Sequence, residues 1–287
     1  MLRHAILQAT SLLILCISIS GCASKHGTKA EIRQLIRSEP ELVLNVLQEN
    51  GQEFLHILKL AEANEAIYNA RAQMLVDLKH PVLEPYTNTK QPAPTTQITV
   101  YLDFLCPFCR ESQSSLNKFA TQAGSANVKV TTKFIGTEDT SSLLAVCYEA
   151  LRYQQKDLPN LLQNFTRDIF NNQRKLKTEP ETIDRIITKL GVDIDRLNKD
   201  MKAIHADGMT LSFMHEAASL GFNATPGYVI NGVRHVGFLN ARQIQEIADL
   251  KEKYAHGGKN AVLPFIERLH PLKEDLSNFD NHQSCGG

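Results

Sequence analysis

Cys106 and Cys109 are the residues of this chain whose type and spacing most directly suggest chemistry. They are separated by Pro107 and Phe108 in the segment LDFLCPFCR, which begins at Leu102. Two cysteines with this spacing serve as part of a metal site, as a structural disulfide or as a redox-active dithiol. The surrounding sequence has to distinguish these three uses.

The cysteine pair lies between an expected strand and an expected helix. Residues 97–105 (QITVYLDFL) are rich in β-branched and aromatic residues and predict a buried strand. Pro107 is favourable at the first position of a helix, and the helical pattern continues over residues 112–121. Residues 127–135 (NVKVTTKFI) predict a second strand. The segment therefore predicts a strand–helix–strand unit with the cysteines at the start of its helix.

This position favours the reactive form of Cys106. A thiolate attacks a disulfide, whereas a free thiol with a pKa of about 8.5 is mostly protonated at neutral pH. The N-terminus of a helix presents unpaired N–H groups and a partial positive charge, which stabilise a thiolate. Cys109 follows one turn later, close enough to form the disulfide. We predict that these two residues are catalytic, with Cys106 as the exposed nucleophile and Cys109 as the buried resolving thiol.

A metal site and a structural disulfide fit the sequence less well. A closed zinc site needs four ligands, usually with a second close pair, but Cys147 and Cys285 stand alone and no histidine pair has ligand spacing. A disulfide that closes so small a loop removes little entropy from the unfolded chain. We therefore expect neither a metal nor a cofactor.

The N-terminus predicts export. A short basic segment precedes an apolar run that ends at Ile19, which is typical of a signal peptide over residues 1–21 and short for a membrane-spanning helix. The four residues that end at Cys22 (ISGC) resemble the lipobox of bacterial lipoproteins, in which the chain is cut before the cysteine and the thiol is acylated. The alternative is an ordinary secretory signal followed by an incidental cysteine.

Lipidation at Cys22 would anchor the chain in a membrane of the bacterial cell envelope, facing the periplasm. Ala23 follows in place of Asp, which by resemblance to Gram-negative lipoproteins favours the outer membrane over the inner. Disulfides persist in such a compartment, so export favours a redox or structural pair over a zinc site. The 31 basic and 31 acidic residues balance, which argues against a nucleic-acid partner.

Residues 22–80 predict a short polar tether followed by a helical arm. Apolar residues recur at helical spacing between Leu42 and Leu78, outside the domain that follows. This stripe favours self-association into a homo-oligomer, and the alternative is an arm folded back on its own domain. Residues 81–96 contain four prolines among polar residues and predict a linker.

The second half of the chain predicts helices, a hairpin and a last helix. The pattern is mostly helical from about residue 143 to 220, and Asn231-Gly232 between two apolar runs indicates a type I′ turn. Asn240 predicts the N-cap of a final helix over residues 241–254. Residues 258–287 form a less patterned tail, apart from a short helical segment at residues 264–269.

The segments VYLDFLCPFC and ATPGYVING, with the helical block between them, resemble the DsbA family of thioredoxin-fold thiol-disulfide oxidoreductases over about residues 95–255. The resemblance implies an α/β thioredoxin fold at residues 97–257 with a helical insertion at about 141–220, preceded by the α-helical N-terminal arm. It also implies a cis bond between Thr225 and Pro226, which would face the cysteines and dock the substrate backbone. The arm itself resembles the oligomerising arm of some disulfide isomerases.

Residues around the pair are expected to tune its redox potential. Pro107 and Phe108 lie between the cysteines, and Phe108 replaces the histidine of the strongest oxidases in the family, which should raise the pKa of Cys106 and weaken the oxidant. Thr225 is the choice typical of isomerases. Asp103 is either a proton acceptor for Cys109 or a solvated acid on the face of the strand.

The sequence thus predicts an exported, membrane-anchored enzyme that forms or isomerises disulfides in exported proteins that contain cysteines. A membrane-bound or soluble redox partner must reset the pair. The alternative is a non-enzymatic surface lipoprotein or chaperone that retains the thioredoxin fold. Cys147 is expected to be a buried and inert thiol, although a disulfide with Cys285 is a further alternative.

Overall fold

The computed structural model describes residues 34, 37–82, 95–124 and 127–273 of the 287-residue chain. The expected signal peptide, Cys22, most of the linker and Cys285 lie outside these residues. The chain divides into two compact units, Met1–Glu62 and Ala63–Gly287, which are described separately below.

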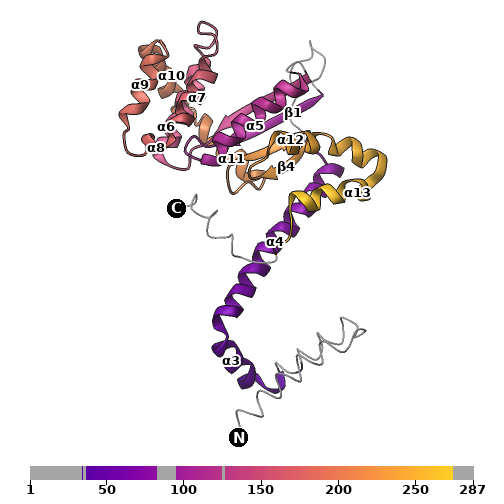
Figure 1. Cartoon of the computed structure of the whole chain (residues 1–287). Coiled ribbons are helices and arrows are strands. Elements are labelled where there is room, and N and C mark those ends of the chain that lie inside the picture. Colours follow the sequence, from indigo (N-terminus) through magenta and orange to yellow (C-terminus); the bar gives the residue numbers. More distant parts are fainter. Residues whose placement is uncertain (1–33, 35–36, 83–94, 125–126, 274–287) are drawn as a thin grey trace. The chain divides into compact units, whose positions relative to one another are not determined.

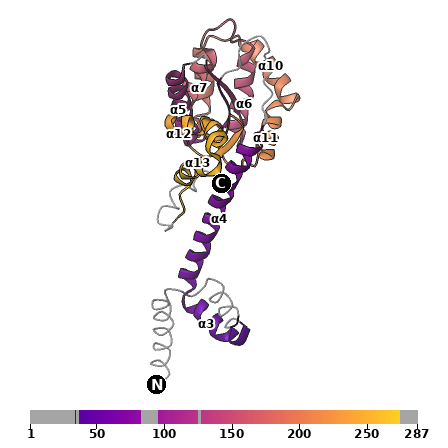
Figure 2. The ribbon, with the colours of Figure 1, turned by 90° about the vertical axis from the view of Figure 1, so that its right-hand side faces the viewer.

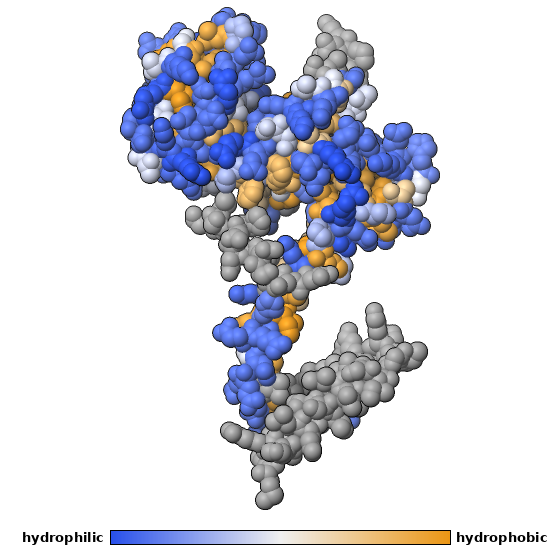
Figure 3. Space-filling model, viewed as in Figure 1, coloured by the Kyte–Doolittle hydropathy of each residue, from blue (hydrophilic) through white to orange (hydrophobic). Residues whose placement is uncertain are grey.

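The first unit contains the helix α3, Pro40–Glu49, and the beginning of α4, Gly51–Lys79. Pro40 occupies the first turn of α3, where its missing N–H would have no helical partner. Large apolar side chains of these helices are 39–56% exposed, and Figure 3 shows apolar residues along the described part of α4. They are Leu42, Leu44, Phe54, Leu55, Ile57 and Leu58. Among the residues of this unit that the structure describes, none buries these apolar side chains of the predicted stripe.

The second unit is built on a four-stranded mixed sheet with the order β2-β1-β3-β4. The central strand β1, Thr96–Leu102, runs parallel to β2, Val128–Phe134, and antiparallel to β3, Gly227–Ile230. Strand β4, Val233–Val236, completes the sheet beside β3. The helix α5, Pro107–Ala123, connects β1 to β2, so the predicted strand–helix–strand unit is confirmed (Figure 1).

The turn between β3 and β4 has the conformation that its sequence predicts. Asn231 and Gly232 both have positive φ, 49° and 84°, as a type I′ turn requires. The Asn231 side chain accepts a hydrogen bond from the Gln97 N–H at 2.9 Å and donates one to the Ala248 carbonyl at 3.0 Å. This turn therefore also fixes the start of β1 and the end of a C-terminal helix.

Six helices between β2 and β3 form the predicted insertion, and Figures 1 and 2 show most of them gathered to one side of the sheet. They are α6 (Asp139–Arg152), α7 (Leu161–Asn171), α8 (Gln173–Leu176), α9 (Glu181–Lys189), α10 (Ile194–Ala206) and α11 (Met209–Ser219). The apolar faces of α6 and α7 join the sheet in one hydrophobic core. The predicted fold, a thioredoxin fold with a helical insertion, is confirmed.

The C-terminal part differs from the prediction. One helix was expected over residues 241–254, but the structure has α12, Ala241–Ala248, and then α13, Leu250–Leu269. The predicted cap at Asn240 is confirmed, since its side chain accepts from the Gln243 N–H. The expected tail at residues 258–287 therefore begins as helix, up to Leu269. Val262, Phe265 and Ile266 bury one face of α13, and the helix is kinked at Gly258.

The end of α4 belongs to the second unit and not to a separate arm. Met74 and Leu78 are at most 5% exposed and form part of its main core. Asp77, between them, forms an ion pair with Arg234 of β4 at 2.7 Å. The predicted arm is therefore not one element. The end of α4, with Met74 and Leu78, belongs to the core of the second unit, whereas apolar residues such as Leu55 in the first unit are exposed.

Candidate active site

Cys106 occupies the N-cap of α5, directly after β1 and a short turn. Its backbone is extended, with φ −80° and ψ 119°, and Pro107 provides the first helical residue. The Cys106 carbonyl accepts a hydrogen bond from the Cys109 N–H at 3.1 Å, which closes the first turn. Cys106 is partly exposed, whereas Cys109 is fully buried. The structure therefore has the predicted asymmetry between an accessible and a buried thiol.

Hydrogen bonds favour the thiolate of Cys106. A bond from the Cys109 thiol, helped by the Thr225 side chain and by the N–H groups of Cys109 and Phe108, lowers the pKa of Cys106 from 9.0 to about 6, although burial opposes this shift. A pKa near 6 means that the attacking species predominates at neutral pH.

Cys109 has the opposite tendency. Burial, and next its hydrogen bond to Cys106, raise the pKa of Cys109 well above its usual range. The Asp103 N–H donates to the Cys109 sulfur at 3.3 Å. When a disulfide between the two sulfurs breaks, Cys109 therefore takes up a proton while Cys106 remains ionised.

The loop before β3 lies opposite the cysteines. The bond between Thr225 and Pro226 is cis, as the family resemblance implies. The Cys106 thiol lies 3.5 Å from the Thr225 carbonyl, and the Gly237 N–H donates to the Pro226 carbonyl at 2.8 Å. Residues separated by 119 positions in the sequence thus form the two walls of one site.

The pH dependence of Cys106 alkylation follows from this geometry. The rate at which iodoacetamide reacts with Cys106 of the reduced chain should rise with pH and then level off, and the midpoint of the rise should lie near pH 6. Peptide mass spectrometry should find the label on Cys106 and not on the buried Cys147. A midpoint near 9 would contradict the assignment of Cys106 as the stabilised thiolate. The lowered pKa of Cys106 also stabilises the folded, reduced chain relative to the unfolded chain. This stabilisation is complete above pH 9 and is lost as the pH falls through about 6.

Comparison with known proteins supports the fold. A family model described as thioredoxin matches residues 90–250, more than half of the chain. The chain belongs to the thioredoxin family. No curated protein matches the sequence.

Three solved structures to which this chain is similar come from bacteria. A thioredoxin-like oxidoreductase from Silicibacter pomeroyi is 23% identical and has a TM-score of 0.47, with 56% of this chain and 89% of that chain covered. The thiol-disulfide exchange protein alpha-DsbA2 from Wolbachia pipientis is 15% identical, with a TM-score of 0.47 and coverage of 65% and 97%. ScsC from Proteus mirabilis is 17% identical, with a TM-score of 0.42 and coverage of 79% and 98%.

Asp103 of this thioredoxin-family chain is neither solvated nor on the open face of a strand. It is 3% exposed and follows the end of β1, so the interpretation as a solvated acid is wrong. Its carboxylate accepts hydrogen bonds from the Leu105 N–H at 2.7 Å and from the Thr137 N–H and hydroxyl at 3.3 and 3.1 Å. The side chain thus ties the turn before Cys106 to the loop before α6, and its role as a proton acceptor stays a prediction.

Two further residues hold the turn that carries Cys106, and the sequence motifs single out neither of them. The Phe104 ring stacks on Phe134 at 3.7 Å and contacts Phe165 and Phe170 of α7. The Gln173 side-chain amide, from α8, donates to the carbonyls of Phe104 and Cys106. Aromatic content indicates that Phe104 is buried, but no pattern in the sequence marks Gln173.

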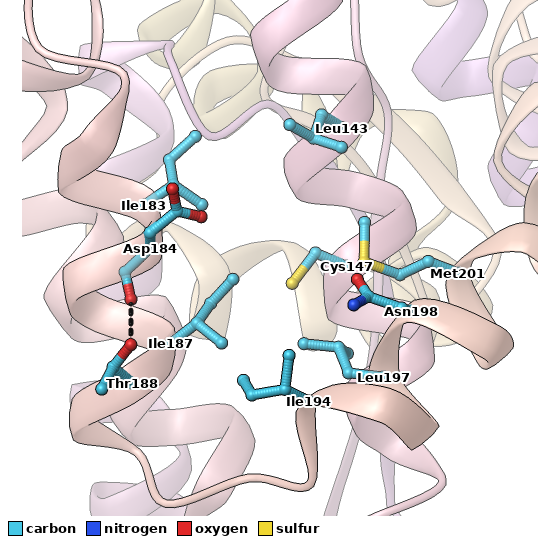
Figure 4. Close-up of a pocket in the computed structure, with 10 residues that line it drawn as sticks. All are labelled: Leu143, Cys147, Ile183, Asp184, Ile187, Thr188, Ile194, Leu197, Asn198 and Met201. Atoms are coloured by element: carbon cyan, nitrogen blue, oxygen red, sulfur yellow. Dashed lines mark hydrogen bonds between the residues drawn. The ribbon is translucent and has the colours of Figure 1, made fainter.

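A hollow in the helical insertion contains the third described cysteine. Its volume is about 400 Å³, and α6, α9 and α10 form its walls. Figure 4 shows Cys147 among the apolar side chains Leu143, Ile187 and Leu197. Cys147 is a free thiol and 1% exposed, and burial raises its pKa to about 12. Cys147 is therefore a buried core residue, as predicted, and its inertness stays a prediction.

Two features are absent from the residues that the structure describes. Within the residues that the structure describes, no three or more His, Cys, Asp or Glu side chains gather where they could hold a metal ion. None of the helices in the described ranges is long and apolar enough to cross a membrane.

Proposed function

We propose that the chain is an exported, membrane-anchored protein thiol-disulfide oxidoreductase that uses Cys106 and Cys109 as its redox pair. The observation that carries the proposal is the asymmetry of the pair beside Thr225-Pro226. Cys106 is partly exposed with a pKa of about 6, whereas Cys109 is buried with a raised pKa. A purely structural disulfide has no need of such an asymmetry.

In the oxidising direction, a substrate thiolate attacks the sulfur of Cys106 in the oxidised pair. The bond between the two cysteine sulfurs breaks, and its electron pair leaves on Cys109, which takes up a proton. A second substrate thiolate then attacks the substrate sulfur of the mixed disulfide, and Cys106 leaves as a thiolate. The substrate has lost two electrons and gained a disulfide, and the enzyme holds a dithiol that a membrane-bound or soluble disulfide-containing partner must reoxidise.

In the isomerising direction, the reduced pair starts the reaction. The Cys106 thiolate attacks an incorrect substrate disulfide and forms a mixed disulfide with one of its sulfurs, while the other sulfur leaves as a thiolate. This thiolate attacks another substrate disulfide, and the thiolate released there attacks the substrate sulfur of the mixed disulfide. Cys106 then leaves as a thiolate, so no net oxidation occurs. Thr225 and Phe108 favour this milder chemistry over strong oxidation. We propose that the backbone at Thr225 and Pro226 docks an extended substrate segment beside the Cys106 sulfur.

The N-terminal sequence supports a proposed location for the enzyme. A signal peptide at residues 1–21 and lipidation at Cys22 would hold the domain at a membrane of the cell envelope, with the outer membrane favoured by Ala23. There it would meet exported proteins whose cysteines pair in an oxidising compartment.

A redox titration separates the enzyme from a non-enzymatic lipoprotein or chaperone. The chain is equilibrated at a series of glutathione ratios, its free thiols are alkylated, and the reduced fraction is measured by mass. We expect half-reduction between about −120 and −270 mV, the range spanned by redox-active members of the fold, and a potential below about −300 mV would indicate a structural disulfide.

We further propose that the helical arm joins copies of this chain. Its six exposed apolar side chains on α3 and the start of α4 need a partner surface, and a second copy offers the same stripe. The chain without its first 22 residues should be oligomeric by light scattering, whereas a chain that begins at Ala63, where the second unit starts, should be monomeric.

A matched pair of variants refines this experiment. Leu55→Asp places a charge among the exposed apolar residues and should reduce the subunit count, whereas Gln52→Asp adds the same charge at an exposed polar position and should not. Equal subunit counts for the long and short chains would remove the arm from the assembly.

A further inference from the structure

The side-chain amide of Gln173 binds the catalytic turn from the helical insertion. Its Nε2 atom donates to the Phe104 carbonyl at 2.8 Å and to the Cys106 carbonyl at 2.9 Å. An amide nitrogen has two hydrogens, and both are used on the two carbonyls that flank Leu105. Gln173 is 7% exposed, so water does not readily replace these bonds.

The two carbonyls belong to the part of the backbone that sets the position of the reactive sulfur. Cys106 is the N-cap residue of α5, and its carbonyl also accepts hydrogen bonds from the N–H groups of Cys109 at 3.1 Å and Arg110 at 3.4 Å in the first turn of that helix. The Phe104 ring packs against aromatic residues of β2 and α7. The turn between β1 and α5 is thus held by the Gln173 amide and by the Phe104 ring, and both contact the insertion.

We propose that Gln173 is a positioning residue for the redox pair: its amide holds the turn at residues 104–106 so that the Cys106 sulfur stays at the N-terminus of α5 and beside the Thr225 carbonyl. This assignment rests on the proposed function of the pair. It gives the helical insertion a part in the chemistry, because the turn that carries Cys106 is held from α8 as well as from the sheet.

Loss of the donor should weaken the thiolate. Two buried carbonyls would lose their partner, and the turn would adjust to find another or to admit water. The hydrogen bonds to the Cys106 sulfur would lengthen as the turn moves, and the partial positive charge of the amide beside the Cys106 backbone would be lost. We therefore expect the proton affinity of the Cys106 thiolate to rise about threefold to tenfold, which is a rise of about 0.5 to 1 in its pKa.

The experiment compares two Gln173 variants with a matched control. Gln173→Met keeps a similar volume without donors, and Gln173→Glu keeps the shape but places an acceptor against both carbonyls. The control is Gln154→Met. Gln154 is a 3% exposed glutamine of the same insertion, and its amide bonds the Asp193 backbone at 3.0 and 2.9 Å, not the catalytic turn. The pKa of Cys106 is measured by thiolate absorbance, and stability by urea unfolding.

Both Gln173 variants should raise the pKa of Cys106, with the larger rise in Gln173→Glu, whereas Gln154→Met should lower stability and leave that pKa unchanged. A pKa unchanged in both Gln173 variants, or shifted equally by Gln154→Met, would overturn the proposal and leave Gln173 a stability residue. If one Gln173 variant does not fold, the other decides by the same measurement. The thiolate pKa needs no substrate, so this result is independent of whether the wild-type chain oxidises or isomerises disulfides.

Discussion

Replacing Cys106 with serine is expected to abolish disulfide exchange with reduced, unfolded proteins. The serine hydroxyl neither ionises near neutral pH nor forms a disulfide, so the first bond to the substrate cannot form. Loss of the catalytic nucleophile of a serine protease lowers its rate by about 10⁶-fold, and we expect a loss of at least several orders of magnitude here. The measurement is the rate at which the oxidised chain removes thiols from a reduced, unfolded protein, with Cys106→Ser compared to the wild type.

Two other cysteine variants serve as controls for that result. Cys109→Ser keeps the Cys106 thiolate but removes the resolving thiol, so mixed disulfides with substrate should accumulate on a non-reducing gel. Cys147→Ala removes a buried thiol of the insertion and should leave the exchange rate within about twofold of the wild type, although it costs some stability. A Cys106→Ser chain that still oxidised substrates at the wild-type rate would contradict the proposed function.

Features that depend on neighbouring residues could be predicted from the sequence. The order of strand, cysteine and proline predicted Cys106 at a helix N-terminus, because β-branched and aromatic residues in a strand and a proline at the first helical position are local signals. Asn231-Gly232 specified its turn for the same reason, since few residue pairs tolerate two positive φ angles. The cis bond before Pro226 followed from resemblance alone.

Contacts between distant segments could not be predicted in this way. Gln173 lies 67 positions from Cys106, in a polar stretch between two helical segments where a glutamine ordinarily faces water. Asp103 could be given two interpretations because its environment depends on Thr137, 34 positions later. The sequence shows which residue types are present, but a buried polar residue is identified only once the chain segments that bond to it are brought together.

The division of the arm was missed for a related reason. Apolar residues at helical spacing run through α3 and α4 without a break, and the pattern does not show which turns meet the domain. The residue that shows where α4 meets the domain is Asp77. A charged residue in a helix ordinarily faces solvent, so its sequence position gives no sign of this contact. It is fully buried, and its carboxylate accepts hydrogen bonds from the Arg234 N–H and guanidinium and from the Gln73 amide.

Replacing Asp77 with alanine is therefore expected to lower the free energy of unfolding by about 3 kcal/mol or more. Removing one partner of a buried ion pair leaves the other charge unpaired, at a cost of about 3–5 kcal/mol. The Arg234 side chain is 21% exposed and can regain some hydration, which places the expected loss near the lower end of that range. Urea unfolding of the wild type and variant measures it.

The matched control is Glu179→Ala, which breaks an ion pair with Arg185 whose side chains are 44% and 62% exposed. Its cost should stay below about 1 kcal/mol, because water screens an exposed pair. The double variant Asp77→Leu/Arg234→Met should unfold less readily than Asp77→Ala, since no unpaired charge remains. If Asp77→Ala cost no more than Glu179→Ala, the ion pair would not be what fixes the last turns of α4 on strand β4, and the apolar contacts of Met74 and Leu78 would suffice.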